Sequence, residues 1–421
     1  MEFRLTRDDP VEPQNKEIAD LVEATKSKAD SKQVIKRLGA VKAECEKGLV
    51  HRVVLGKAGA YSALLDTLAA YRAYKDVSKH CFRTLIALMK KQPDLLDDRG
   101  VDVILSYLEK DSDPDLKKFS LKWTRQCSIM HEMNRQKIFN ANIVRYLKQT
   151  LTVSISEVVK EALAVCRVLV LDDDVRVEYG KAHEHARIIA NETLCSLVSL
   201  LNRYQQDETM IAEIMMTITA LLVREEFCQK LEDAGAFEII KAIMTQFESH
   251  EKILKQCFKL LKAVSGNDNC KLHIIERTFA PIITAVLDAN KVSAQVAISG
   301  LQCVAALALR CPQNSKALLD EGFAEVVVGI MKLHADEETV QKTASWAVRN
   351  MVSRNKSHGR NFLSLGIEDL LRADLEKFEG IEYDVKAALR DLNCNVNLKE
   401  EWTGTGGALT TGFTFTNVEW S

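Results

Sequence analysis

The residues in this chain that could bind a metal ion gather in one segment, Leu171 to Glu192. The aspartates Asp172 to Asp174 are followed by His183 and His185, and both residue types ligate zinc in proteins. Side chains two positions apart on a helix point about 200° from each other, so the two histidines would not chelate one ion together. Runs of carboxylates at helix boundaries are typical of helix caps and solvated charge. We therefore expect no metal site and no cofactor.

The other reactive side chains do not form a catalytic arrangement. His80 and Cys81 are adjacent, so on a helix they point about 100° apart and do not suit the roles of base and nucleophile. The sequence contains neither G-x-S-x-G nor H-E-x-x-H, and TGTGG at 403–407 lacks the lysine of a phosphate-binding loop. The sequence predicts a protein that is not an enzyme. The alternative, an enzyme whose site is assembled from scattered helices, requires a pocket with strongly shifted titratable groups.

The elements that carry these residues are helices, and the stretch from Lys316 to Asn355 shows their pattern most clearly. After Gly322, apolar residues follow at offsets 0, 3, 4, 7 and 8, which is one stripe of an α-helix. A short helix, a break and two antiparallel helices cannot bury their apolar faces alone, so the unit requires similar neighbours on both sides. The final helix of the unit carries the apolar residues Val340, Ala344, Ala347, Val348 and Met351 on one face.

Matching units recur along the chain with a spacing in the low forties. Successive breaks lie 41, 42, 50, 43, 43, 44 and 44 residues apart, and the long spacing indicates an insertion. A period of this length made only of helices is typical of armadillo or HEAT arrays. The break glycines, and TASWAVRNMV from Thr343, resemble the armadillo-repeat family. The predicted break positions are Gly59, Gly100, Asn142, Glu192, Gly235, Thr278, Gly322 and Gly366.

This resemblance implies an all-α fold, a right-handed superhelical solenoid (α-α superhelix) of about eight armadillo-like repeats. We expect the insertion to form an exposed loop joined to an extra short helix, and to be cut early by proteases. The expected limits are a flexible N-terminal arm at 1–15, N-terminal capping helices at 16–48, the repeats at 49–392 with the insertion at 171–192, and an irregular C-terminal tail at 393–421.

The charge of the chain is nearly balanced, with 57 basic and 59 acidic residues. Net charge therefore gives no reason to expect a nucleic acid or a membrane as the partner. The sequence also lacks an apolar run of about 18 residues and a signal-peptide core at its N-terminus. We expect an intracellular protein, located in the cytoplasm or the nucleus.

The eleven cysteines follow the repeat rather than a disulfide framework. Free cysteine behaves as a small core residue, and unpaired thiols indicate a reducing compartment. We expect five cysteines to lie in the core of successive third helices: Cys81, Cys127, Cys166, Cys257 and Cys303.

The resemblance also implies a binding groove. In importin-α-like arrays, the third helix of each repeat lines the concave face, where W-x-x-x-N pairs hold an extended peptide. Trp346 and Asn350 match that pair once, and Arg83 and Lys122 are among the residues that take the tryptophan position elsewhere. We expect the indole to form a wall and the amide to bind partner backbone. The alternative is that the ring of Trp346 packs against the next third helix as part of the core. The candidate partner-binding residues, which share one helix face, are Lys342, Trp346, Arg349 and Asn350.

The sequence thus predicts a non-enzymatic scaffold or adaptor, a monomer that binds a protein or peptide along the groove. A nuclear-transport-type peptide receptor is the alternative, and the single W-x-x-x-N pair argues against it. The insertion DDDVRVEYGKAHEHARIIANE and the ending AALRDLNCNVNLKEEWTGTGG, together with the repeat spacing, resemble one subfamily of armadillo-repeat proteins. That resemblance implies an array without enzymatic activity.

Overall fold

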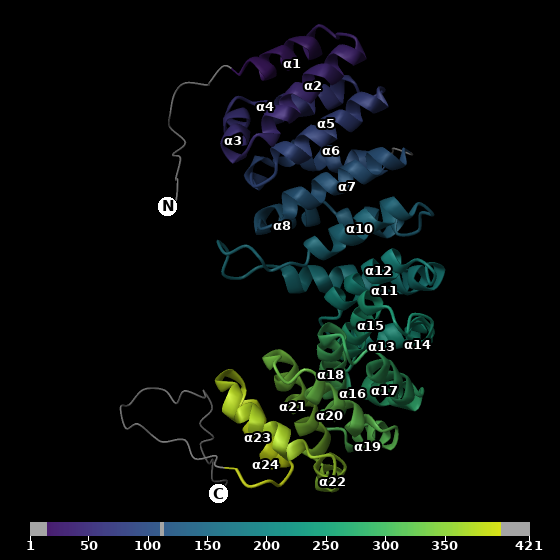
Figure 1. Cartoon of the computed structure of the whole chain (residues 1–421). Helices are drawn as coiled ribbons and strands as arrows, with labels where there is room; N and C mark the ends of the chain where they lie inside the picture. Colours follow the sequence, from purple (N-terminus) through teal and green to yellow (C-terminus); the bar gives the residue numbers. More distant parts are fainter. Residues whose placement is uncertain (1–14, 110–112, 397–421) are drawn as a thin grey trace, which may run out of the picture. The chain divides into compact units, whose positions relative to one another are not determined.

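The computed structural model describes residues 15–109 and 113–396 (Figure 1). Within these ranges the chain forms 24 α-helices, three short 3₁₀ helices and no strand, which confirms the all-α prediction. The predicted arm at 1–15 and tail at 393–421 lie outside the described residues, apart from Asn15 and residues 393–396. Asn15 caps the first helix by accepting a hydrogen bond from the Ile18 amide at 3.3 Å.

The chain divides into two compact units, with a boundary after Ile282 inside α17. The helices up to that boundary are α1 (Lys16–Lys26), α2 (Ser31–Glu46), α3 (Leu49–Lys57), α4 (Ala60–Ala70), α5 (Lys75–Leu88), η1 (Pro93–Leu95), α6 (Asp98–Glu109), α7 (Pro114–Ser128), α8 (Glu132–Asn140), α9 (Ile143–Thr150), α10 (Ser156–Val168), α11 (Ala182–Arg203), α12 (Glu208–Leu221), α13 (Glu225–Asp233), α14 (Ala236–Gln246), α15 (Glu251–Val264), α16 (Asp268–Glu276) and α17 (Phe279–Ala289). The helices beyond it are α18 (Ala294–Ala308), α19 (Pro312–Asp320), α20 (Phe323–Leu333), α21 (Glu338–Val352), η2 (Lys356–His358), α22 (Gly359–Leu363), α23 (Ile367–Lys377), η3 (Glu379–Ile381) and α24 (Glu382–Asp391).

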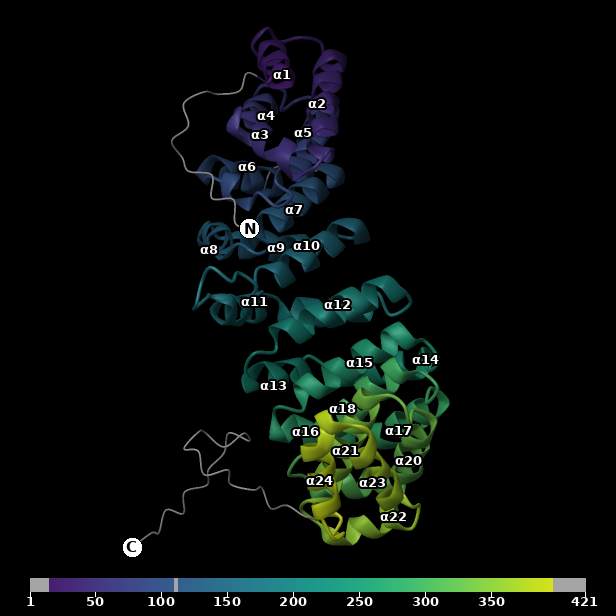
Figure 2. The ribbon, with the colours of Figure 1, turned by 60° about the vertical axis from the view of Figure 1, so that its left-hand side comes forward.

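The helix that ends each repeat is called its third helix below, and these helices form a layer within each unit (Figure 2). In the first unit α5 packs on α7, α7 on α10, α10 on α12, and α12 on α15. The helix α2 packs on α5 in the same way, so α1 and α2 stand in for the second and third helices of an incomplete repeat. In the second unit α18 packs on α21, and α21 on α24.

Six of the eight predicted breaks have the left-handed backbone that turns the chain between two helices. Their φ angles lie between 62° and 82°, a region that glycine enters at little cost and that asparagine tolerates better than most residues. Each of the six directly precedes the helix that the sequence predicted: Gly59, Asn142, Gly235, Thr278, Gly322 and Gly366.

The predicted breaks at Gly100 and Glu192 are wrong. Gly100 lies in the first turn of α6, and a Cβ there would overlap the Tyr61 hydroxyl and approach a Leu96 methyl at 2.8 Å. The position therefore requires glycine for a close contact, not for a turn. Glu192 lies inside α11, where the first two helices of the fourth repeat are fused into one helix of 22 residues.

The insertion is a loop at 169–181 between α10 and α11. The prediction of an extra short helix at its end is wrong, because the residues from Ala182 onward belong to the long helix α11.

Several repeats are joined by a side chain that caps the preceding third helix. The last carbonyl groups of a helix lack backbone partners, and here a residue of the following element donates to one of them. In each case the donor lies seven residues after the acceptor: Arg52 to Cys45 at 3.0 Å, Asn134 to Cys127 at 2.8 Å, Arg135 to Ser128 at 3.0 Å, Asn314 to Leu307 at 3.0 Å and, with Nδ1 at 3.1 Å, His358 to Met351.

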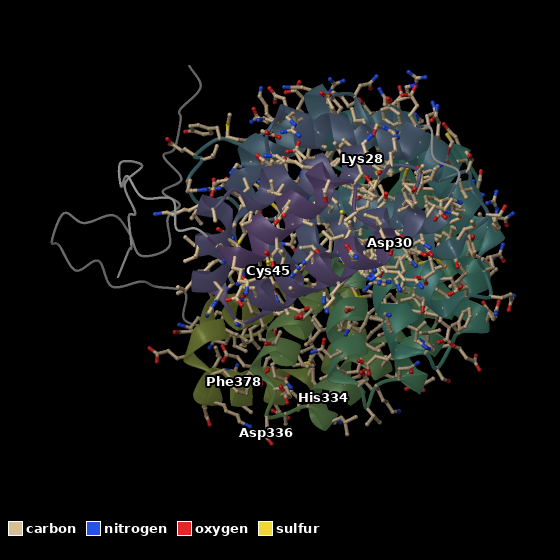
Figure 3. The ribbon with its side chains drawn as sticks, turned by 90° about the horizontal axis from the view of Figure 1, so that it is seen from above. Lys28, Asp30, Cys45, His334, Asp336 and Phe378 are labelled. Carbon is tan, nitrogen blue, oxygen red and sulfur yellow. The ribbon has the colours of Figure 1, made fainter. Side chains whose placement is uncertain are left out.

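Loops on the edge of the second unit are also tied between repeats, at a place where Figure 3 labels His334, Asp336 and Phe378. His334 Nε2 lies 2.7 Å from the carbonyl oxygen of Lys291, one repeat earlier. Lys377 donates to the carbonyl of Ala335 at 2.8 Å and pairs with Asp336. These contacts link the loops that precede the third helices of neighbouring repeats.

The core is apolar, and the five cysteines predicted to lie in it are fully buried. All eleven cysteines of the chain are free thiols. In the described ranges no single helix is long and apolar enough to cross a membrane, and α3 with α4 reaches that length only as a pair bent by 69°.

Candidate protein-binding site

The middle of α21 presents Trp346, whose surface is 45% exposed. The predicted apolar stripe of this helix, from Val340 to Met351, is buried, with Met351 only 1% exposed. Lys342 is exposed, and Arg349 and Asn350 are half-buried. The structure therefore places the four candidate residues on the side of α21 that faces away from the core.

Asn350 is partly engaged within the protein. Its Nδ2 donates a hydrogen bond of 2.8 Å to the carbonyl oxygen of Ala305 on α18. At least one amide N–H of Asn350 therefore links two third helices instead of being available to a partner's backbone.

Lys342 and Arg349 face the next third helix, α24. Lys342 Nζ lies 3.7 Å from an oxygen of Asp384, and Arg349 Nε lies 3.8 Å from an oxygen of Asp391. Pairs this long between partly exposed side chains contribute little to stability. Both cations remain close enough to the surface to contact a partner.

A second exposed aromatic residue lies on α24 beside this site. Tyr383 is 64% exposed. Its helix packs on α21, and the adjacent Asp384 contacts Lys342. The site therefore combines the exposed indole of Trp346 with two cations.

The insertion, the other candidate surface, is fastened to α8 by buried charges. Arg135 is fully buried and donates to Glu132 at 2.9 Å and to Asp173 at 2.5 Å. Asp174 accepts a hydrogen bond of 2.8 Å from the backbone amide of Glu132. Glu132 in turn accepts one of 2.7 Å from the backbone amide of Lys181. The aspartates therefore cap the N-terminus of α8, the role that such carboxylates commonly have.

The carboxylates of Asp174 and Glu132 are held in their charged form. Hydrogen bonds from Arg176 keep the pKa of Asp174 well below its usual range. Burial favours the neutral form of Glu132, but hydrogen bonds from Gln136, the Lys181 amide and Arg135 outweigh it and lower the pKa. The insertion is thus a loop fixed at its base by ion pairs and amide hydrogen bonds.

The two histidines of the insertion lie in different environments. His183 is exposed, whereas His185 is buried and its ring stacks on Phe139 with centroids 3.9 Å apart. Burial lowers the pKa of His185, and its Nδ1 lies 3.0 Å from the Leu169 carbonyl oxygen. Among the residues that the structure describes, no group of three or more histidine, cysteine or acidic side chains could hold a metal ion.

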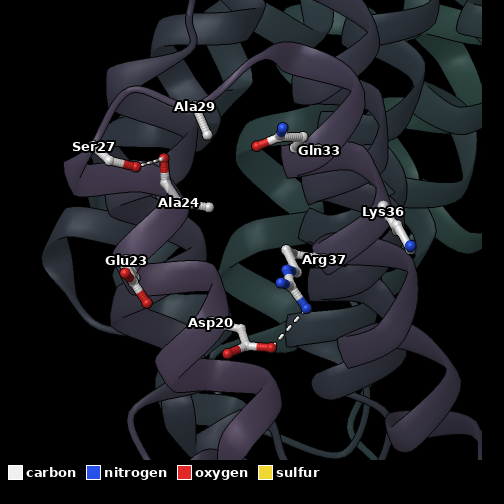
Figure 4. A pocket seen from close by; sticks show the side chains of 8 residues that line it. All are labelled: Asp20, Glu23, Ala24, Ser27, Ala29, Gln33, Lys36 and Arg37. Carbon is white, nitrogen blue, oxygen red and sulfur yellow. Dashed lines mark hydrogen bonds and ion pairs between the residues drawn. The ribbon is translucent and has the colours of Figure 1, made fainter.

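A pocket of about 450 Å³ lies between α1 and α2 (Figure 4). Asp20 and Arg37 face each other across it and pair at 2.6 Å, with Glu23 and Lys36 nearby. Its acidic and basic side chains balance, so it offers a ligand no net charge.

The sequence did not predict a groove of about 490 Å³ that lies on the third helices α2, α5 and α7 and on α3. Arg83 and Lys122, which occupy the tryptophan position in the first two repeats, line it together with Arg52 and Phe119. The signal that could have found it is a basic residue at this position in two successive repeats.

The comparisons with known proteins agree with this architecture. Residues 14–411 match the ARMC6 family. The chain is 39% identical over 381 residues to armadillo repeat-containing protein 6 homolog of Drosophila melanogaster, covering 89% of this chain and 82% of the relative. It is 29% identical to armadillo repeat-containing protein 6 of Homo sapiens, covering 87% of this chain and 76% of the relative.

Solved structures show the same fold at low identity. The crystal structure of an engineered protein superposes with a TM-score of 0.75 at 18% identity, covering 89% of this chain and 88% of that one. A structure concerned with the interaction between cadherin and β-catenin gives a TM-score of 0.64 at 15% identity, covering 89% and 68%. The fold is that of the armadillo-repeat solenoids. This chain belongs to the ARMC6 family of armadillo-repeat proteins.

Proposed function

We propose that this chain is a non-enzymatic scaffold that binds an extended segment of a partner protein on the face of its third helices, around Trp346. The observation that carries the proposal is the 45% exposure of this indole in the middle of a packed helix. Tryptophan is enriched among the residues that dominate protein interfaces, because a rigid ring buries much area at small entropic cost.

The neighbours of Trp346 suit the same role. The hydrogen bond of 2.8 Å from Asn350 to α18 holds the helix surface beside the indole in one geometry. A partner would then lose little free energy in ordering this surface. The indole would form a wall, and the two cations, Lys342 and Arg349, would contact polar or acidic groups of the partner.

The burial of three cysteines supports a non-enzymatic role. Burial raises the pKa of Cys45 and of Cys166 to about 12, and that of Cys228 to about 11. A nucleophilic cysteine requires a lowered pKa, so these thiols are suited to the core. Armadillo solenoids are typically non-catalytic, and the free thiols support a location in the reducing interior of the cell.

Affinity capture from cell lysate with three proteins tests the proposal: the wild type, Trp346→Ala and Tyr179→Ala. Tyr179 is 83% exposed on the insertion, so its variant removes an exposed aromatic ring from the other candidate surface. We expect the Trp346→Ala protein to lose the partners that the other two retain. Truncation of a core tryptophan lowers the free energy of unfolding by ~3–5 kcal/mol. The loss in Trp346→Ala should be much smaller, so its melting temperature should fall only slightly.

Two results would contradict the proposal. Capture that is lost in Tyr179→Ala alone would move the binding surface to the insertion. A large fall in the melting temperature of Trp346→Ala, with capture restored in the cold, would show that the ring belongs to the core.

A further inference from the structure

The groove beside the third helices of the first repeats is rich in positive charge and is called the basic groove below. It has a volume of about 490 Å³ and lies on α2, α3, α5 and α7. Among its lining residues Glu46 is the one carboxylate. The basic side chains and the aromatic residue that line it are Lys42, Arg52, Arg83, Lys90, Lys122 and Phe119.

Three of these cations lack a counter-ion among the described residues, namely Arg52, Arg83 and Lys90, whereas Lys42 and Lys122 are paired. No carboxylate of the described residues lies within ion-pair distance of Arg83 or Lys90, and both side chains are exposed. Arg83 instead lies over the ring of Phe119, 5.0 Å from its centroid. By contrast, Lys42 pairs with Glu46 at 2.6 Å and Lys122 with Glu161 at 3.5 Å. The unpaired charge therefore lies on α3, on α5 and in the turn that follows α5.

Arg52 gives a second, independent observation. It is 8% exposed, and it donates from Nη1 to the Cys45 carbonyl at 3.0 Å (Figure 3 labels Cys45). Its Nε, which is also buried, has no hydrogen-bond partner among the described residues. A buried guanidinium N–H without a partner is costly, and this one belongs to a side chain that lines the groove.

We propose that the basic groove binds an acidic, extended peptide segment of a partner protein. The carboxylates of the segment pair with Arg52, Arg83 and Lys90. The inference rests on the proposed function, because it also assigns partner binding to third helices, but it places a separate subsite in the first unit.

The lining favours a peptide over a nucleic acid. Glu46 within the groove and Glu161 beside Lys122 would repel a continuous phosphate backbone. The ring of Phe119 already has Arg83, Lys118 and Lys122 within 5.0 to 5.9 Å of its centroid, so a nucleobase would have to displace them to stack. Separate carboxylates on a flexible chain can meet the cations without these contacts.

Fluorescence anisotropy with the full chain tests the inference. The probe is a short fluorescein-labelled peptide in which Asp and Glu alternate with Leu, beside its Asn and Gln counterpart. We expect the wild type to bind the acidic probe and not the neutral one. The double variant Arg83→Glu, Lys90→Glu should raise the Kd at least about tenfold, because it replaces two attractive charges by repulsive ones.

Matched variants separate the groove from other effects. Lys32→Glu with Lys36→Glu makes the same change in net charge on the exposed side of α2 and should leave the Kd unchanged. Arg52→Asn should weaken binding while keeping the melting temperature close to that of the wild type. Asparagine can still cap the preceding helix, as Asn134 and Asn314 do at equivalent positions.

Three results would overturn the inference: equal affinity for the acidic and neutral probes, an unchanged Kd in the Arg83→Glu, Lys90→Glu protein, or tighter binding of a single-stranded oligonucleotide at the same residues. Trp346→Ala distinguishes the two proposals. If this variant loses partner capture while the acidic probe fails to bind, only the basic groove is wrong. If the probe binds as expected while Trp346→Ala retains every partner, the site around Trp346 is wrong.

Discussion

At the scale of single residues, Asp374 on α23 is a buried carboxyl with an oxygen that accepts no hydrogen bond from the described residues. It is 5% exposed, and its Oδ2 has no hydrogen-bond partner among the described residues. Burial raises the pKa of this carboxyl to about 6 from its ordinary value of 3.8. The folded chain therefore binds a proton here more tightly than the unfolded chain does.

Because the folded pKa is the higher one, the contribution of Asp374 to stability is complete below about pH 4 and is lost as the pH rises toward about 6. Asp374→Asn should raise the free energy of unfolding by about 2 kcal/mol near pH 7 and change it little near pH 4. Urea denaturation at both pH values measures this. Asp369→Asn, an exposed carboxyl on the same helix, is the control, and an equal gain at both pH values would contradict the prediction.

At the same scale, the exposure of Trp346 could be predicted from its position opposite the apolar stripe, but the bond of Asn350 could not. That bond depends on the carbonyl of Ala305, one repeat away, and sequence periodicity contains no information on such a distance. The basic groove was missed for a similar reason. Arg52 comes from a different helix than Arg83, and only packing brings them together.

At the scale of elements, the break positions show where pattern and backbone conformation separate. The pattern marked glycine at both Gly59 and Gly100, yet only Gly59 has a left-handed backbone. Gly100 is needed for its contact with Tyr61, which the sequence could not reveal. The apolar pattern that resumes after Glu192 predicted a break there, but two helices are fused into α11 and no break occurs.

The insertion yields a prediction at this scale. Its base is held by Asp174, which bonds the Glu132 amide at 2.8 Å and Arg176 Nε at 2.8 Å. Asp174→Ala removes these charged hydrogen bonds, each of which contributes about 1.5–3 kcal/mol. We expect trypsin to cut after Arg176 at least about tenfold faster in this variant, because the loop opens more often.

Timed digestion with mass spectrometry of the fragments measures the cleavage. Asp172→Ala is the control, since Asp172 is exposed and lies two residues before the cap. Equal cleavage of the wild type and Asp174→Ala would show that the ion pairs do not hold the loop.

At the scale of the whole molecule, the repeat period of 41 to 44 residues was enough to predict an all-α armadillo array. Each repeat buries its apolar faces only against its neighbours, so the same pattern must return at every step. Surfaces that bind partners are not required by this packing and need not repeat. Trp346 therefore occurs once in its register, and its function had to be argued from exposure and neighbours.

The central claim is that the face of α21 around Trp346 contacts the partner. Site-specific photo-crosslinking tests it most directly, with the photoreactive residue benzoylphenylalanine placed at Trp346 or, as a control, at Val292, which is 76% exposed between α17 and α18. The account predicts a covalent adduct with the captured partner from position 346 and none from position 292. Adducts from position 292 alone, or from neither position while capture persists, would contradict it.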